Sequence, residues 1–126
     1  MMMFTDSSRG KSIAKDPAVV RYQGRYFLYY SVSGEGMAGW GIGIATSQDL
    51  ETWEKIGEIP PTDDHESNGI CAPGAIVLGD RVHIFYQTYG NRHRDAICNA
   101  YSEDGVHFQR NSSNPIILSL IHISEP

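Results

Sequence analysis

The feature that most constrains this chain is an internal repeat with a period of about 56 residues. Residues 16–31, DPAVVRYQGRYFLYYS, align with residues 72–87, APGAIVLGDRVHIFYQ, at an offset of 56, and the prolines, arginines and several apolar positions coincide. Residues 41–54, GIGIATSQDLETWE, align with residues 96–109, AICNAYSEDGVHFQ, at an offset of 55. A copied unit of this length is one supersecondary module, which buries its apolar face only against a neighbouring copy.

Each copy predicts four short strands and no helix. The apolar and aromatic runs are short and are separated by clusters of Gly, Pro, Asn and Asp, which is typical of strands joined by turns. No segment shows helical periodicity. The expected strands are residues 18–22, 25–32, 41–46 and 52–56 in the first copy, and residues 74–78, 81–88, 96–101 and 107–110 in the second.

Both copies share the pattern S-x-D-[LG]-x-x-[WF] before their last strand. It reads SQDLETW in residues 47–53 and SEDGVHF in residues 102–108. Ser and Asp at the start of such a turn can bond its exposed amides, and the aromatic residue then packs between sheets. We interpret the pattern as structural rather than catalytic.

Tandem four-stranded units of about 40 to 56 residues predict an all-β fold, the β-propeller, in which each unit is one blade. The two blades are expected at residues 14–59 and 70–117. Two blades do not close a ring, so the chain is expected to be part of a larger propeller. Its apolar sheet faces and strand edges are then left open, which favours association and poor solubility.

Charge and composition exclude several classes of function. The 126 residues carry a formal net charge of −5, so no basic surface is expected for nucleic acid. No apolar run is long enough for a membrane helix, and no signal peptide is present, so localisation stays open, including a secreted or periplasmic parent. Cys71 and Cys98 lie in no motif with metal-site spacing, so we predict no metal and no cofactor; whether they pair is open.

The last nine residues are treated separately from the fold. Residues 118–126, LSLIHISEP, match the translation of a common transposase sequencing adapter. We therefore assign the natural domain to residues 1–117 and expect the reading frame of a larger protein to have been cut near Ile117. The alternative is a genuine C-terminal strand.

One face of the predicted propeller collects the long loops. In a four-stranded meander, the loops between the second and third strands and between blades emerge together, opposite the tight turns. Here these loops are residues 33–40, 60–72 and 89–95, which are rich in carboxylate, His, Asn, Arg and Trp side chains. Such a face suits a polar, ring-shaped ligand. Asp16 begins the innermost strand and is expected to point towards the central axis, while Pro17 fixes φ.

These residues carry a family resemblance. Residues 15–31, 41–59 and 71–90 resemble the first two blades of the five-bladed β-propeller glycosidases, most closely glycoside hydrolase family 43 and its relatives, and the resemblance spans residues 2–117. It implies a carbohydrate substrate and hydrolysis of O-glycosidic bonds in oligo- or polysaccharides. The sugar, the linkage, exo or endo action and the oligomeric state are not determined by these residues.

The resemblance assigns a catalytic role to Asp16. In that family an Asp before Pro at the start of the first blade is a general base, which activates a water that attacks the anomeric carbon with inversion. The general acid comes from later blades, and the repeat places Ala72 at the equivalent position, so we expect this chain alone to be inactive. The related β-fructosidases carry Asn-Asp-Pro-Asn-Gly and retain configuration; KDPAV lacks both Asn residues and the Gly, which favours inversion.

Candidates for substrate binding lie on the same loops, namely Trp40, His65, Glu66, Asn68, Arg92 and Asp95. An indole suits the apolar face of a sugar, but a Trp between glycines is equally a packing residue. The polar candidates are of a kind that is often only solvated. The competing hypothesis is a lectin-like propeller that binds carbohydrate without catalysis, and a scaffold for protein partners is a third.

Overall fold

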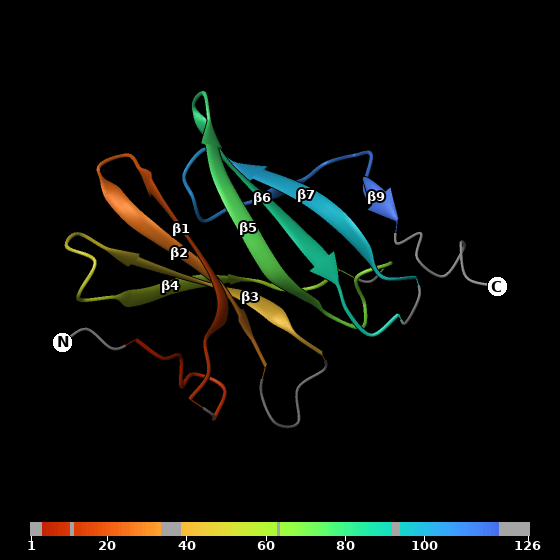
Figure 1. Cartoon of the computed structure of the whole chain (residues 1–126), viewed down its shortest axis with the longest axis horizontal. Coiled ribbons are helices and arrows are strands. Elements are labelled where there is room, and N and C mark those ends of the chain that lie inside the picture. The colour runs from red at the N-terminus through yellow and green to blue at the C-terminus, as the bar shows by residue number, and fades with distance from the viewer. Residues whose placement is uncertain (1–3, 11, 34–38, 63, 92–93, 119–126) are drawn as a thin grey trace.

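The computed structural model describes residues 4–10, 12–33, 39–62, 64–91 and 94–118. They form two antiparallel sheets that pack face to face (Figure 1). The first sheet has the order β1 (Lys15–Tyr22), β2 (Arg25–Val32), β3 (Gly41–Ser47) and β4 (Glu54–Ile59). The second has the order β5 (Ile70–Leu78), β6 (Arg81–Thr88), β7 (Ala96–Ser102) and β8 (Gln109–Arg110), and β9 (Ile117–Leu118) also pairs with β7. The predicted all-β fold is confirmed.

The innermost strands differ from prediction at their prolines. β1 and β5 begin at Lys15 and Ile70, several residues before the predicted starts. Each strand takes its proline into a β-bulge, so pairing with the next strand continues on both sides of it. The register shifts between Lys15 and Ala18 in β1 and between Cys71 and Gly74 in β5. The repeat in the sequence is therefore also a repeat of this irregularity.

The shared turn pattern forms the hydrogen bonds that the sequence predicts. Ser47 Oγ accepts bonds from the amides two and three residues later, at 3.1 and 2.9 Å. Asp49 Oδ1 accepts hydrogen bonds from the amides of Glu51 and Thr52, at 2.9 and 2.8 Å. Ser102 and Asp104 repeat all four contacts in the second sheet, at 2.8 to 3.2 Å. Because the turn occupies these residues, β4 and β8 each start two residues later than predicted.

The core lies between the two sheets. Its fully buried members include Phe27, Tyr29, Ile42, Ile44, Ile70, Val82, Ile84, Cys98 and Ala100. The turn pattern of the second sheet is anchored on the first, because Tyr29 donates a hydrogen bond to the Gly105 carbonyl at 2.8 Å. Phe108, the aromatic residue of that pattern, packs edge-on against Tyr29 with ring centroids 5.6 Å apart. These contacts fix one blade against the other.

The chain before β1 packs on the outer face of the first sheet. Its apolar residues Phe4, Ile13 and Ala14 pack against Leu28, Tyr30, Val32 and Ala45. Asp6 is buried there, where it accepts a hydrogen bond from Tyr30 at 2.7 Å and pairs with Lys55 Nζ at 2.7 Å. Burial alone would raise the pKa of Asp6, but hydrogen bonds from Lys55, Ser8 and Tyr30 outweigh it and lower the pKa to about 2.

The outer face of the second sheet exposes apolar side chains. Ile76 is 46% exposed, Leu78 50% and Phe85 39%. An open apolar face of this kind is what the sequence predicts for blades that do not complete a ring. Among the described residues, no helix is long and apolar enough to cross a membrane.

Candidate active site

The three long loops meet at one end of the sheets. Glycines allow their backbones to approach closely: a Cβ on Gly39 would lie 2.4 Å from the Asn68 carbonyl oxygen, and one on Gly69 would lie 2.7 Å from the Trp40 amide nitrogen. A Cβ on Gly90 would lie 2.9 Å from the Asn68 Cβ. The loops that follow β2, β4 and β6 are thereby packed against one another, as the blade arrangement predicts.

Asp16 lies at the start of β1 on a strained backbone. Its φ is 55°, in the left-handed region that residues other than glycine adopt infrequently, although Asp is enriched there. Ala72, the equivalent residue of the second sheet, has a φ of 54°. Both residues precede a proline and sit in the bulge of their strand. The scaffold repeats the conformation, and only the first copy places an exposed carboxylate on it.

Ser31 on β2 connects the Asp16 side chain to the second sheet. Its hydroxyl donates to Asp16 Oδ2 at 2.9 Å and accepts from the Ala72 amide at 2.7 Å. Ser31 is fully buried, whereas Asp16 is exposed, so the bridge runs from the interior to the surface. The carboxylate is thus oriented by a residue that joins both blades. No motif in the sequence marks Ser31 for this role.

Trp40 lies beside Lys15 and Tyr89. The Lys15 ammonium is 5.2 Å from the centroid of the Trp40 ring, and Tyr89 packs edge-on with ring centroids 6.3 Å apart. Tyr89 is 47% exposed and Trp40 is partly exposed. Lys15 precedes Asp16 directly, so this aromatic pair borders the start of the strand that carries the candidate carboxylate. Lys15 and Tyr89 were not predicted, since neither belongs to a recognisable motif.

Cys71 lies in the electrostatic field of two of the candidate residues. Burial, and after it the negative charges of Asp16 and Asp95, raises the pKa of the Cys71 thiol. Both carboxylates therefore disfavour the thiolate form of Cys71. Cys71 and Cys98 are both free cysteines.

Asp95 and Asn68 take part in a network that shapes the loop after β6. Asp95 Oδ1 accepts a hydrogen bond from the Asn91 amide at 3.0 Å and one from the Thr88 hydroxyl at 3.4 Å. Asn68 is exposed and donates to Asn91 Oδ1 at 2.7 Å. Two predicted residues therefore meet through Asn91. Arg92 lies outside the described residues.

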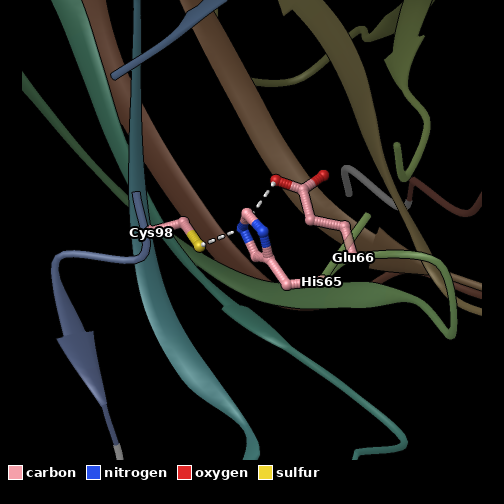
Figure 2. A group of neighbouring side chains, drawn as sticks. All are labelled: His65, Glu66 and Cys98. Carbon is pink, nitrogen blue, oxygen red and sulfur yellow. Dashed lines mark hydrogen bonds and ion pairs between the residues drawn. The ribbon is translucent and has the colours of Figure 1, made fainter. Parts of the chain in front are cut away.

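Glu66 and His65 lie deeper than the other candidates. Glu66 has no exposed surface; it accepts hydrogen bonds from Tyr86 at 2.6 Å and from Arg110 Nη2 at 2.9 Å, and it joins the loop before β5 to β6 and β8. Its side chain offers no surface to a sugar and holds the fold together. His65 is partly exposed, and its Nε2 lies 3.4 Å from Cys98 Sγ (Figure 2).

Comparison with known protein families gives one match, which covers most of the chain. Residues 11–124 match the Glycosyl hydrolases family 32 N-terminal domain. The chain belongs to this family. The predicted β-propeller glycoside hydrolase is confirmed at the level of the larger group that includes families 32 and 43.

The chain is also similar to curated proteins and to solved structures. The chain is 32% identical over 83 residues to the "Probable arabinan endo-1,5-alpha-L-arabinosidase B" of Aspergillus oryzae. This alignment covers 58% of this chain and 24% of that protein. The fructan 1-exohydrolase IIa of Cichorium intybus has a TM-score of 0.71 and 23% identity, covering 82% of this chain and 21% of that one. The Bombyx mori GH32 beta-fructofuranosidase BmSUC1 has a TM-score of 0.67 and 25% identity, covering 83% and 24%.

These comparisons bear on the fold and on the length of the domain. The similarity to the Cichorium intybus structure supports the blade arrangement that the repeat predicts. The family 32 N-terminal domain described here spans about a quarter of the length of the curated relatives it matches.

Proposed function

We propose that this chain forms the first two blades of an enzyme that hydrolyses O-glycosidic bonds in a plant or algal oligo- or polysaccharide, with Asp16 as general base. The observation that carries the proposal is the exposed Asp16 carboxylate, oriented by Ser31 at the end where the long loops meet. A left-handed conformation at such a residue costs about 1–3 kcal/mol, and because Ala72 shares it, the carboxylate and not the backbone distinguishes Asp16.

The proposed chemistry needs two carboxyl groups. Asp16 takes a proton from a water molecule as the water attacks the anomeric carbon, and a general acid about 6.5 to 9.5 Å away protonates the leaving oxygen. We place the general acid in a later part of the parent protein. The absence of both Asn residues and the Gly of Asn-Asp-Pro-Asn-Gly around Asp16 supports inversion of configuration.

The substrate class follows from the aromatic pair and from the Aspergillus relative. Trp40 and Tyr89 present aromatic surface beside the start of β1, which suits the apolar face of a sugar ring. The name of the Aspergillus oryzae protein supports arabinan as the substrate. His65, Asn68, Arg92 and Asp95 remain proposed sources of hydrogen bonds to the substrate.

The experiment is a pair of matched substitutions in the complete reading frame that encodes this chain. Asp16→Asn should lower kcat/KM on aryl α-L-arabinofuranosides by about 10²- to 10⁴-fold, the usual contribution of a general base. Asp80→Asn, at an exposed carboxylate in the turn between β5 and β6, should leave it unchanged. A loss of less than about tenfold in Asp16→Asn contradicts the assignment.

The stereochemistry of the product separates the two roles that Asp16 can have. Proton NMR of the anomer formed first should show inversion if Asp16 is a general base. Retention would instead make Asp16 a nucleophile that forms a covalent intermediate, which is the role of the equivalent Asp in the β-fructosidases.

The second candidate function is carbohydrate binding without catalysis. The aromatic pair of Trp40 and Tyr89 favours it, because stacking on a sugar requires no carboxylate. A binder would retain its affinity for arabino-oligosaccharides in Asp16→Asn and lose it in Trp40→Ala, and the wild-type parent would release no reducing ends. Turnover by the parent excludes this alternative.

A further inference from the structure

Three side chains with different ligand atoms converge next to β7. His65 and Glu66 come from the loop between β4 and β5, and Cys98 comes from β7 (Figure 2). His65 Nε2 lies 3.4 Å from Cys98 Sγ and 3.9 Å from Glu66 Oε2. The three ligand atoms all lie within 4.8 Å of one another. Cys98 and Glu66 are fully buried, whereas His65 is partly exposed, so water reaches this group from the His65 side.

The His65 ring is held in the orientation of a metal ligand. Its Nδ1 lies 3.3 Å from Asp64 Oδ1, so a carboxylate stands beside one ring nitrogen while Nε2 lies towards Cys98 and Glu66. Asn91 also fixes the backbone of His65, by donating to its carbonyl oxygen at 2.9 Å. A carboxylate behind a histidine is the usual outer support of protein metal sites.

Glu66 is supported in the same way. Tyr86 donates to Oε2 at 2.6 Å, and Arg110 Nη2 donates to Oε1 at 2.9 Å. These bonds hold the carboxylate with Oε2 towards His65. Arg110 Nε also reaches Oε2, at 3.4 Å, so a cation would take the place of this long contact beside the Tyr86 hydroxyl.

The types of ligand atom and their separations suit Zn²⁺. One thiolate sulfur, one imidazole nitrogen and one carboxylate oxygen form a mixed set that zinc accepts with tetrahedral geometry. Bond lengths of about 2.0 to 2.3 Å place two tetrahedral ligands about 3.5 Å apart. The separations of 3.4 and 3.9 Å around His65 Nε2 are close to this value, so small side-chain movements would close the site.

We propose that His65 Nε2, Cys98 Sγ and Glu66 Oε2 bind one Zn²⁺ ion. The fourth position faces the partly exposed side of His65, where water completes the coordination. The ion links the loop before β5 to β7 next to the end where the long loops meet. This proposal concerns metal binding and stability of the chain itself, and it does not depend on the assignment of Asp16. A zinc ion on Nε2 of His65 would remove that atom from the proposed contacts to the substrate.

The sequence alone gave no sign of this site. His65 and Cys98 are 33 residues apart and come from different elements, so no spacing motif connects them. The competing explanation of the same contacts is a simple hydrogen bond between the Cys98 thiol and the His65 ring. The experiment below separates the two.

The test is titration of the untagged 126-residue chain, stripped with EDTA, with ZnCl₂ by isothermal titration calorimetry. We expect one ion per chain and a higher Tm with zinc, because an ion that binds only the folded chain stabilises it. Asp64→Asn should weaken the Kd for Zn²⁺ by about 10- to 100-fold, the usual effect of losing an outer partner, and Cys98→Ser by more. Cys71→Ser, at the other buried cysteine, should bind as the wild type does.

A second readout begins with the wild-type chain and does not need a cysteine variant. CoCl₂ added to the wild-type chain should give thiolate-to-cobalt charge-transfer absorption in the near ultraviolet if Cys98 is a ligand. His65→Gln should abolish this band and His83→Gln should retain it, which keeps the test decisive if Cys98→Ser does not fold. The proposal is overturned by the absence of the band, by the absence of zinc binding, or by equal zinc affinity in Cys98→Ser and Cys71→Ser.

Discussion

Replacing Arg110 with methionine should destabilise this chain far more than the same change at an exposed arginine. Glu66 has no exposed surface, and Arg110 supplies its charged partner through Nη2 at 2.9 Å and Nε at 3.4 Å. Removing one partner of a buried ion pair costs about 3–5 kcal/mol. Because Tyr86 and the Thr62 amide still donate to Glu66, we expect about 3 kcal/mol, near the lower end of that range.

The measurement is urea denaturation in EDTA, followed by tryptophan fluorescence. With an m-value of about 2 kcal/mol/M, a loss of about 3 kcal/mol lowers the midpoint by about 1.5 M. The matched control is Arg81→Met, because the Arg81 side chain is 46% exposed and lies 3.6 Å from Glu103. An exposed pair contributes about 0–1 kcal/mol, so the control should scarcely move the midpoint.

A double variant tests the physical reason. Glu66→Gln combined with Arg110→Met removes the uncompensated charge, so the double variant should be more stable than Arg110→Met alone. The reasoning is refuted if Arg110→Met and Arg81→Met shift the midpoint equally, or if the double variant is less stable than Arg110→Met.

Three further predictions concern other parts of the chain. Ser31→Ala removes the partly buried hydrogen bond to the Ala72 amide and should cost about 0.5–1.5 kcal/mol by urea denaturation. Gly43→Ala places a Cβ 2.3 Å from the buried Tyr30 ring and should cost about 1–3 kcal/mol or more by thermal unfolding. Asp6 has a pKa of about 2 in the folded chain and about 3.9 when unfolded, so its contribution to stability is present above pH about 4 and should be lost as pH falls towards 2.

Controls are available for each of these. Gly74→Ala adds a Cβ whose nearest neighbour is 3.9 Å away, so it should cost much less than Gly43→Ala, and an equal cost would contradict the steric argument. Asp6→Asn should flatten the acid side of the stability profile; an unchanged profile would show that Asp6 does not cause it. For Ser31, a midpoint within error of the wild type would show that the bridge adds nothing to stability.

The repeat predicted the fold because the residues that it conserves between copies act through local backbone interactions. The residue types that form hairpins and Ser-x-Asp turns recur at a fixed offset, and those turns determine where strands begin and end. The exceptions are the first strands, where prolines at positions 17 and 73 suggest a start but occupy a bulge instead. A proline removes one hydrogen-bond donor and fixes φ, and a bulge tolerates both. The presence of a proline therefore does not show where the strand begins.

The candidate site was predictable only where one residue carries its own signal. Asp16 is marked by its proline and by the family resemblance. Ser31 acts by bridging Asp16 to the second sheet, and Tyr89 acts through its contact with Trp40. These roles depend on which strands and loops become neighbours, and nothing in the residue types themselves states that. Glu66 was predicted to bind substrate because it is a polar residue in a long loop. It is instead fully buried, because Arg110 on another strand forms an ion pair with it.

The matching backbone at Asp16 and Ala72 means that a copied module can keep its shape while its copies take different duties. The first copy carries the Asp16 carboxylate and the second carries the Ala72 methyl group at the same position of the bulge. A single substitution can therefore place or remove an acidic side chain in either copy without a change in the backbone of the bulge. A propeller built from repeated blades can therefore acquire new active-site residues while its backbone stays the same.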